Sequence, residues 1–212
     1  METVQIKICG VTCLEDVQLL NCYGVDYAGF VLFYPKSKRN LSLEQARLVM
    51  EQLDASIQKV AVVVSPDGDQ IKQIEQVGFD IIQIHGQFSN ELADQITIPI
   101  FRAFHIEEFE SIIEMESVDR VAGFVLDGKD PGSGKVFDWK LTSQLDRQSK
   151  RLMLAGGLHA DNVMDGIEMV HPDIVDVSSG VEKESGIGKD PEKVRVFVET
   201  VRSRSKDSRK EE

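Results

Sequence analysis

The sequence lacks any long run of apolar residues. Of its 212 residues, 42% are hydrophobic and 28% are charged, which is ordinary for a folded globular chain. No apolar stretch approaches the ~20 residues that a membrane-spanning helix needs. The first residues, Met-Glu-Thr-Val-Gln, carry neither the basic flank nor the apolar segment of an export signal. These absences predict a cytoplasmic protein with no membrane partner.

Cysteine is also scarce, and the 24 basic residues are outnumbered by 36 acidic ones. The formal net charge is −12, which argues against nucleic acid as a partner because such binding needs a basic surface. A small anionic ligand stays compatible with this charge, since a few local cations and backbone N–H groups can bind phosphate. The three cysteines, Cys9, Cys13 and Cys22, lie close together without a later Cys or His cluster. This arrangement indicates reduced thiols and argues against a structural zinc site.

Two glycine-rich motifs of nucleotide-binding proteins are missing as well. The turn after the first predicted strand reads Cys-Gly-Val-Thr, without the glycine fingerprint of a dinucleotide-binding fold. The loop Gly128–Lys135 is rich in glycine, but Val136 follows where a P-loop has Ser or Thr. We interpret residues 128–136 either as a flexible connector or as a lid that closes over a substrate.

Short β-branched runs alternate with amphipathic segments along the whole chain. Runs such as Val60–Val64 are apolar without alternation, which is typical of parallel strands covered on both faces. Each repeat has room for a strand, a crossover helix and two loops. Eight such units predict a single (β/α)8 barrel over residues 1–202, with an open doubly wound sheet as the alternative. Strands are predicted to begin near Gln5, Tyr27, Lys59, Asp80, Pro99, Ala122, Arg151 and Ile174.

The segments between the strands carry apolar residues at helical spacing. Ser42 with Gln45 resembles a capping box, and Asp190 before proline resembles a helix N-cap. Residues 203–212 are nearly all charged or serine and are expected to be a frayed tail. Helices are predicted at Glu15–Cys22, Glu44–Leu53, Asp69–Val77, Asn90–Gln95, Glu107–Glu116, Asp138–Leu145, Ala160–Val170 and Pro191–Val201.

Two of the predicted strands end in a residue with a reactive side chain. Cys9 ends the first and Asp127 the sixth, and parallel strands place their carboxyl ends on one rim. The thiol and the carboxylate are therefore expected to face one pocket, where such a pair can transfer protons. Taken alone, Cys9 is more typical of an inert buried residue, because free cysteine is among the most buried residue types and only an activated thiolate is a useful base. A carboxylate after Phe-Val-Leu is costly to bury unpaired, so Asp127 is expected to face the pocket or a cation.

Glycine and serine after the last two strands predict a phosphate site. These residues are Gly156, Gly157, Ser179 and Gly180; barrels frequently bind phosphate at these two loops, although tight turns would use the same residues. Two further side chains have open interpretations. Arg39 could grip a carboxylate with its guanidinium or belong to a solvated charge cluster. His85 could contact a ligand or be a core histidine.

Taken in order, the motifs at the strand ends make a specific set, and the chain resembles the phosphoribosylanthranilate isomerase family of tryptophan biosynthesis. The resemblance covers residues 5 to 202 without a large insertion. One departure is His159-Ala160 after the seventh strand, where Asn and Pro are more usual. The matching pieces are Lys7–Gly10, Gly29–Val31, Tyr34–Ser37, Gln83–Gly86, Gly132–Trp139, Leu154–Leu158, Asn162-Val163 and Asp176–Glu182.

The resemblance implies an Amadori rearrangement of a phosphorylated small-molecule substrate without metal or organic cofactor. It assigns the general base to Cys9 and the general acid to Asp127. It also implies that Arg39 holds the substrate carboxylate and that His85 and Asp176 line the substrate site. Other possibilities are the histidine-pathway Amadori isomerase, a pentose-phosphate epimerase, or an inactive barrel that only binds phosphorylated ligands. A monomer is expected, with a homodimer as the alternative.

Overall fold

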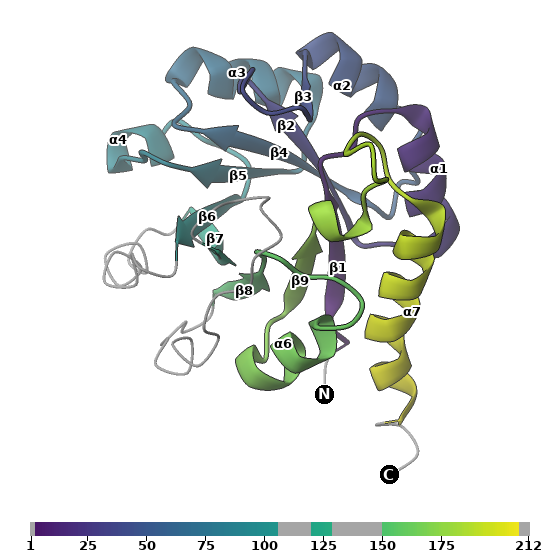
Figure 1. Cartoon of the computed structure of the whole chain (residues 1–212). Helices are drawn as coiled ribbons and strands as arrows, with labels where there is room; N and C mark the ends of the chain where they lie inside the picture. The colour runs from purple at the N-terminus through teal and green to yellow at the C-terminus, as the bar shows by residue number, and fades with distance from the viewer. Residues whose placement is uncertain (1–2, 106–119, 129–149, 208–212) are drawn as a thin grey trace.

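The computed structural model describes residues 3–105, 120–128 and 150–207, and within these ranges eight principal strands form a closed parallel barrel (Figure 1). Their order around the ring is β1-β9-β8-β7-β6-β5-β4-β2, and β1 pairs with β2 to close it. A two-residue strand, β3, runs parallel to β2 outside the ring. The strands are β1 (Gln5–Cys9), β2 (Tyr27–Leu32), β3 (Asn40–Leu41), β4 (Gln58–Val64), β5 (Ile81–His85), β6 (Ile100–His105), β7 (Val121–Asp127), β8 (Arg151–Leu154) and β9 (Ile174–Val177).

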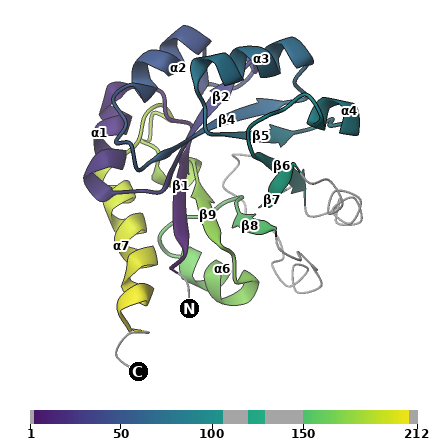
Figure 2. The same cartoon turned by 180° about the vertical axis from the view of Figure 1, so that it is seen from behind.

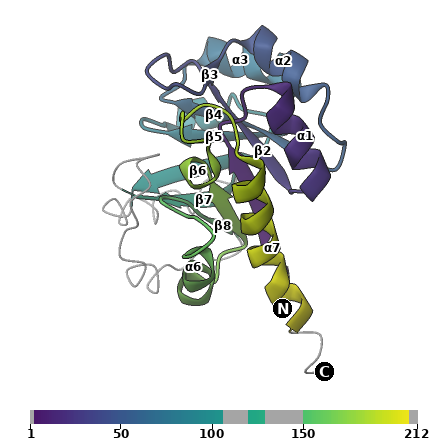
Figure 3. The ribbon, with the colours of Figure 1, turned by 45° about the vertical axis from the view of Figure 1, so that its right-hand side comes forward.

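Helices cover the outside of the barrel, and α1 and α7 lie side by side against it (Figures 2 and 3). No helix in the described ranges is long and apolar enough to cross a membrane. The predicted helices at 107–116 and 138–145 lie outside the described residues. The helical elements are α1 (Leu14–Tyr23), α2 (Leu43–Met50), α3 (Gly68–Val77), α4 (Asn90–Ala93), α6 (Val163–Val170), the 3-10 turn η3 (Ser179–Val181) and α7 (Pro191–Asp207).

Local sequence explains where several helices begin. Ser42 and Gln45 form the predicted capping box of α2, each side chain bonded to the other's backbone N–H. At α7, the Asp190 carboxylate accepts hydrogen bonds from the N–H groups of Glu192 and Lys193, both at 3.0 Å. These side chains satisfy backbone donors that the first turn leaves unpaired.

Three predicted helix boundaries differ from the structure by three residues or more. Helix α2 ends at Met50 instead of Leu53, since a turn follows it. Helix α6 begins at Val163 instead of Ala160, because the Asn162 side chain accepts a hydrogen bond from the His159 N–H at 2.8 Å and holds a turn there. Helix α7 continues to Asp207, into the segment expected to be frayed.

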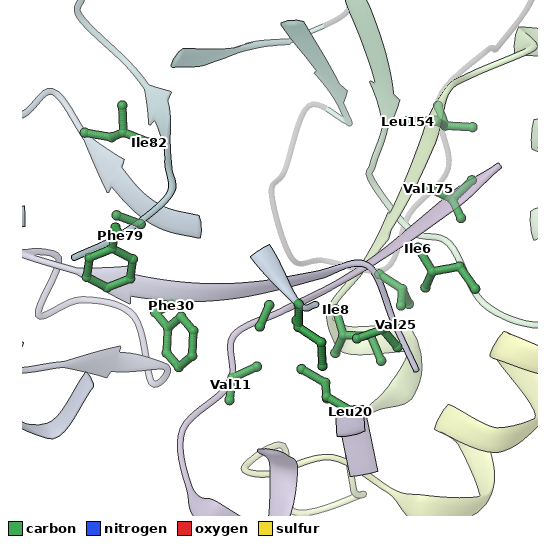
Figure 4. Packing of buried hydrophobic residues seen from close by; sticks show 14 of the residues in the cluster. Ile6, Ile8, Val11, Leu20, Val25, Phe30, Phe79, Ile82, Leu154 and Val175 are labelled. Atoms are coloured by element: carbon green, nitrogen blue, oxygen red, sulfur yellow. The ribbon is translucent and has the colours of Figure 1, made fainter. Parts of the chain in front are cut away.

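Strand alternation divides the apolar side chains into two layers. On β1, Ile6 and Ile8 are fully buried and face the helices, while Lys7 and Cys9 face the barrel interior. Figure 4 shows Ile8 packed with Leu20 of α1 in the outer layer. The barrel interior is filled by a smaller apolar cluster, made of Tyr27, Val60, Val62, Ile81, Phe101, Ala103, Val125, Met153, Ala155 and Ile174.

Candidate active site

A buried ion pair joins the first and last strands of the barrel. Lys7 of β1 and Asp176 of β9 are register partners, and Lys7 Nζ lies 2.8 Å from Asp176 Oδ2. Lys7 is fully buried and Asp176 is 7% exposed. Burial would lower the pKa of Lys7, but Asp176 and Cys9 outweigh burial and raise it. Lys7 is therefore a charged ammonium inside the barrel.

Cys9 ends β1 two residues after Lys7, on the same interior face. A Cβ placed on Gly29 of β2 would lie 3.0 Å from Cys9 Sγ and 3.1 Å from Lys7 Nζ. Thiol and ammonium thus line the same small space, which glycine leaves open. Burial, the largest effect, and the Asp176 carboxylate raise the pKa of the Cys9 thiol above its usual value, and the nearby charges of Lys7 and Lys189 offset this only in part.

Asp127 ends β7 on the same rim, separated from β1 by β8 and β9. Its side chain is 8% exposed, and its Oδ1 accepts a hydrogen bond from the Gly128 N–H at 2.8 Å. Burial, with the Asp176 carboxylate, raises the pKa of Asp127 to about 6, against opposing effects of Gly128, His105 and Lys7. Asp127 is therefore held partly protonated near neutral pH, as an acid catalyst requires.

The backbone around Asp127 depends on glycine. Gly156, just after β8, has φ +82°, and a Cβ there would lie 2.9 Å from Asp127 Oδ1 and 2.4 Å from the Gly128 nitrogen. Any larger residue would displace the carboxylate. Gly156 therefore shapes the acid site as well as the predicted phosphate loop.

His85 ends β5 and is held as a neutral ring. Burial is the main cause that lowers the pKa of His85 to about 3, and the charges of Lys7, Arg102 and His105 add to it. Gln83 Nε2 lies 2.9 Å from His85 Nε2. Because His85 is neutral, this ring nitrogen can accept the amide hydrogen. His85 can then bind a ligand by hydrogen bonding without adding charge.

Two buried polar atoms face this interior without a partner among the described residues. They are Asp176 Oδ1 and Gln83 Oε1. Leaving a buried acceptor unpaired costs about 1–3 kcal/mol. Such atoms are suited to receive hydroxyl groups of a substrate.

The Arg39 side chain lies over Gly10, next to Cys9, and its guanidinium is hydrogen-bonded to Glu182. A Cβ on Gly10 would collide with the Arg39 side chain, so that chain lies over the turn after β1. The Glu182 carboxylate accepts hydrogen bonds from Arg39 Nε and from Arg39 Nη2, the latter at 3.0 Å. Glu182 also pairs with Lys38 Nζ at 3.1 Å and Lys189 Nζ at 3.6 Å. A substrate carboxylate at Arg39 would therefore have to use guanidinium donors other than those that Glu182 binds.

Lys189 connects the Glu182 carboxylate to strand β1, which carries Cys9. It is 1% exposed, and its Nζ donates to the Cys9 carbonyl oxygen at 2.6 Å. The Ser178 hydroxyl donates to the same oxygen at 3.1 Å. Two groups from the end of the chain thus fix the backbone that carries the thiol.

The two predicted phosphate loops touch each other. A Cβ on Gly180 would lie 2.1 Å from the Leu158 carbonyl oxygen, so the loop after β9 packs against the loop after β8. Gly157 has φ +72°, and Ser179 opens η3. The loops that carry Gly156, Gly157, Ser179 and Gly180 therefore meet at Gly180 and Leu158.

Three residues of the site were missed as functional candidates: Lys7, Glu182 and Lys189. Lys7 had a readable signal, because a lysine two residues before Cys9 in an apolar strand must face the same side. The other two become visible only when distant loops meet. Of the proposed lid, only Gly128 lies within the described residues. Within the described ranges, no group of three His, Cys, Asp or Glu side chains could hold a metal ion.

Comparison with known proteins agrees with this geometry. Residues 6–200 match the N-(5'phosphoribosyl)anthranilate (PRA) isomerase family. The chain belongs to this family. The PRA isomerase of Aquifex aeolicus is 39% identical over 206 residues, which are 94% of this chain and 99% of that relative.

Solved structures of PRA isomerases superpose over almost the whole chain. Monomers of the dimeric enzyme from Thermotoga maritima give a TM-score of 0.83 at 33% identity, covering 95% of this chain and 100% of that chain. A PRA isomerase in complex with reduced 1-(o-carboxyphenylamino)-1-deoxyribulose 5-phosphate gives a TM-score of 0.82 at 33% identity, with the same coverage. These matches confirm the predicted family and barrel.

Proposed function

We propose that this chain isomerises N-(5'-phosphoribosyl)anthranilate to 1-(2-carboxyphenylamino)-1-deoxyribulose 5-phosphate in tryptophan biosynthesis. The observation that carries the proposal is that a thiol and a partly protonated carboxyl end two strands on one rim, and that both feel the charges of one buried ion pair. Family membership supports the same reaction. Cys9 is the general base and Asp127 the general acid.

The acid acts first. Protonated Asp127 gives its proton to the ribose ring oxygen as the bond between that oxygen and C1 breaks. The nitrogen lone pair of the anthranilate moiety forms the C1–N double bond of a protonated Schiff base. The Cys9 thiolate then removes the proton from C2, and the electron pair of that C–H bond gives the neutral enolamine. Tautomerisation moves the enol proton to C1 and yields the ketone.

The remaining side chains position the substrate. Arg39 is proposed to bind the anthranilate carboxylate through the guanidinium edge that Glu182 leaves open. Asp176 Oδ1 accepts a hydrogen bond from a sugar hydroxyl, and neutral His85 contributes a further polar contact. The backbone N–H groups around Gly156, Gly157, Ser179 and Gly180 bind the phosphate.

The test follows the loss of anthranilate-adduct fluorescence when purified protein meets freshly made phosphoribosylanthranilate. Cys9→Ser and Asp127→Asn should each lose about 10²–10⁴-fold in turnover, the usual contribution of an acid or a base. Cys22→Ser removes an exposed thiol and should keep full turnover. Near-normal turnover in either of the first two variants contradicts the assigned roles.

A further inference from the structure

Lys7 is a charged group that the acid–base mechanism does not itself use. A fully buried lysine is costly, because an ammonium loses its hydration when it leaves water. One carboxylate, Asp176, compensates on one side at 2.8 Å. The other side of Lys7 faces Cys9 across the space above Gly29. The second neighbour of this ammonium is therefore the thiol that the mechanism needs as an anion.

The charges around Cys9 leave Lys7 as the main source of stabilisation for a thiolate. From β9, Asp176 faces the thiol and opposes its ionisation, while β2 presents only Gly29. From the loop after β9, Lys189 favours ionisation, but its Nζ is hydrogen-bonded to the Cys9 carbonyl oxygen. Across the rim the charge of Lys7 also reaches two other titratable groups, His85 and Asp127.

We propose that Lys7 is a positioning residue for catalysis, whose ammonium is the counter-ion that favours ionisation of Cys9 to the thiolate when it acts as the base. This inference rests on the proposed function of Cys9 as the base. Asp176 completes the arrangement, since its carboxylate keeps Lys7 protonated inside an apolar barrel. The Lys7 ammonium is thus already beside the sulfur atom when Cys9 ionises. The protein therefore does not have to rearrange to stabilise the negative charge of the base.

The experiment measures alkylation of Cys9 by iodoacetamide as a function of pH, read by peptide mass spectrometry. Alkylation can be measured without turnover, so its result tests the role of Lys7 separately from the isomerase activity. In Lys7→Met we expect alkylation of Cys9 near neutral pH to slow by about tenfold or more, since an opposite charge within about 4–6 Å typically moves a pKa by ~1–3. The midpoint of the profile should move to higher pH. Turnover at neutral pH should also fall, because a smaller fraction of Cys9 is then ionised.

Two controls distinguish the loss of the Lys7 charge from a general destabilisation of the fold. The pH profiles of Cys13 and Cys22 in the same protein should stay unchanged. Lys59→Met breaks a partly exposed strand ion pair with Asp80, 3.4 Å long, and should leave the Cys9 profile as in the parent protein. A Cys9 profile in Lys7→Met that superposes on the parent overturns the proposal.

If Lys7→Met does not fold, the double variant Lys7→Met, Asp176→Asn decides the question. It removes both buried charges, so no lone carboxylate stays in the barrel. Lys7 acts on Cys9 more strongly than Asp176 does. We therefore expect a midpoint above that of the parent protein. A midpoint equal to or below the parent value overturns the proposal.

Discussion

Asp127→Asn should make the protein more stable above neutral pH while it removes activity. In the fold, the pKa of Asp127 rises from 3.8 to about 6. A raised pKa means that the folded state binds the proton more tightly than the unfolded state. The carboxyl therefore stabilises the fold below pH 3.8, and this contribution is lost as the pH rises through about 6.

The size of the effect follows from the shift. Each pKa unit corresponds to about 1.36 kcal/mol, so ionised Asp127 costs ~3 kcal/mol of folding free energy at about pH 8. Asparagine removes the charge, and its side-chain oxygen can still accept the hydrogen bond from Gly128 that Asp127 Oδ1 accepts at 2.8 Å. We expect the variant to be more stable than the parent by up to ~3 kcal/mol at that pH.

Urea unfolding of both proteins across the acid and neutral range measures this difference. The stability gain of Asp127→Asn should shrink as the pH falls from about 8 towards 4, because the parent carboxyl becomes protonated. The same samples, assayed by fluorescence, should show that turnover is lost. A stability difference that does not change with pH refutes the reasoning, because the effect would then not come from a buried charge.

Three further outcomes are expected. Arg39→Lys should raise KM about tenfold or more with little change in kcat in steady-state assays, because lysine cannot offer a two-point fork to a carboxylate; an unchanged KM argues against carboxylate binding. Gly29→Ala should lower turnover and the free energy of unfolding by about 1–3 kcal/mol, because the alanine Cβ would lie 3.0 Å from Cys9 Sγ. Full turnover in this variant contradicts the close approach of Gly29 to the thiol. Sedimentation should show a monomer, and a concentration-independent dimer contradicts this prediction.

Local patterns predicted the barrel well. Each of the eight principal strands begins within one residue of its predicted start, because every strand is a short apolar run that the barrel covers on both faces. The capping box at Ser42 and the N-cap at Asp190 were also readable, since each uses residues three or fewer apart. The extension of α7 to Asp207 was not. Its charged residues signal solvent exposure, but lysine and arginine are also good helix formers.

The site was predictable as a set of strand ends but not as a network. Cys9, Asp127 and the last two loops follow from the rule that parallel strands share one rim. The ion pairs do not, because Lys7 and Asp176 are 169 residues apart and Arg39 and Glu182 are 143 apart. Their pairing depends on register and loop path, which no local pattern of apolar residues specifies.

The bonds at the Cys9 carbonyl oxygen have a consequence for how the protein is made. That oxygen is held by Ser178 and Lys189, which the ribosome adds 169 and 180 residues later. Asp176, the partner of Lys7, also belongs to the last strand of the barrel. A nascent chain that has completed seven of the eight principal strands therefore carries the thiol but not the groups that orient it. The environment of the thiol can therefore be complete only after residue 189 has been added.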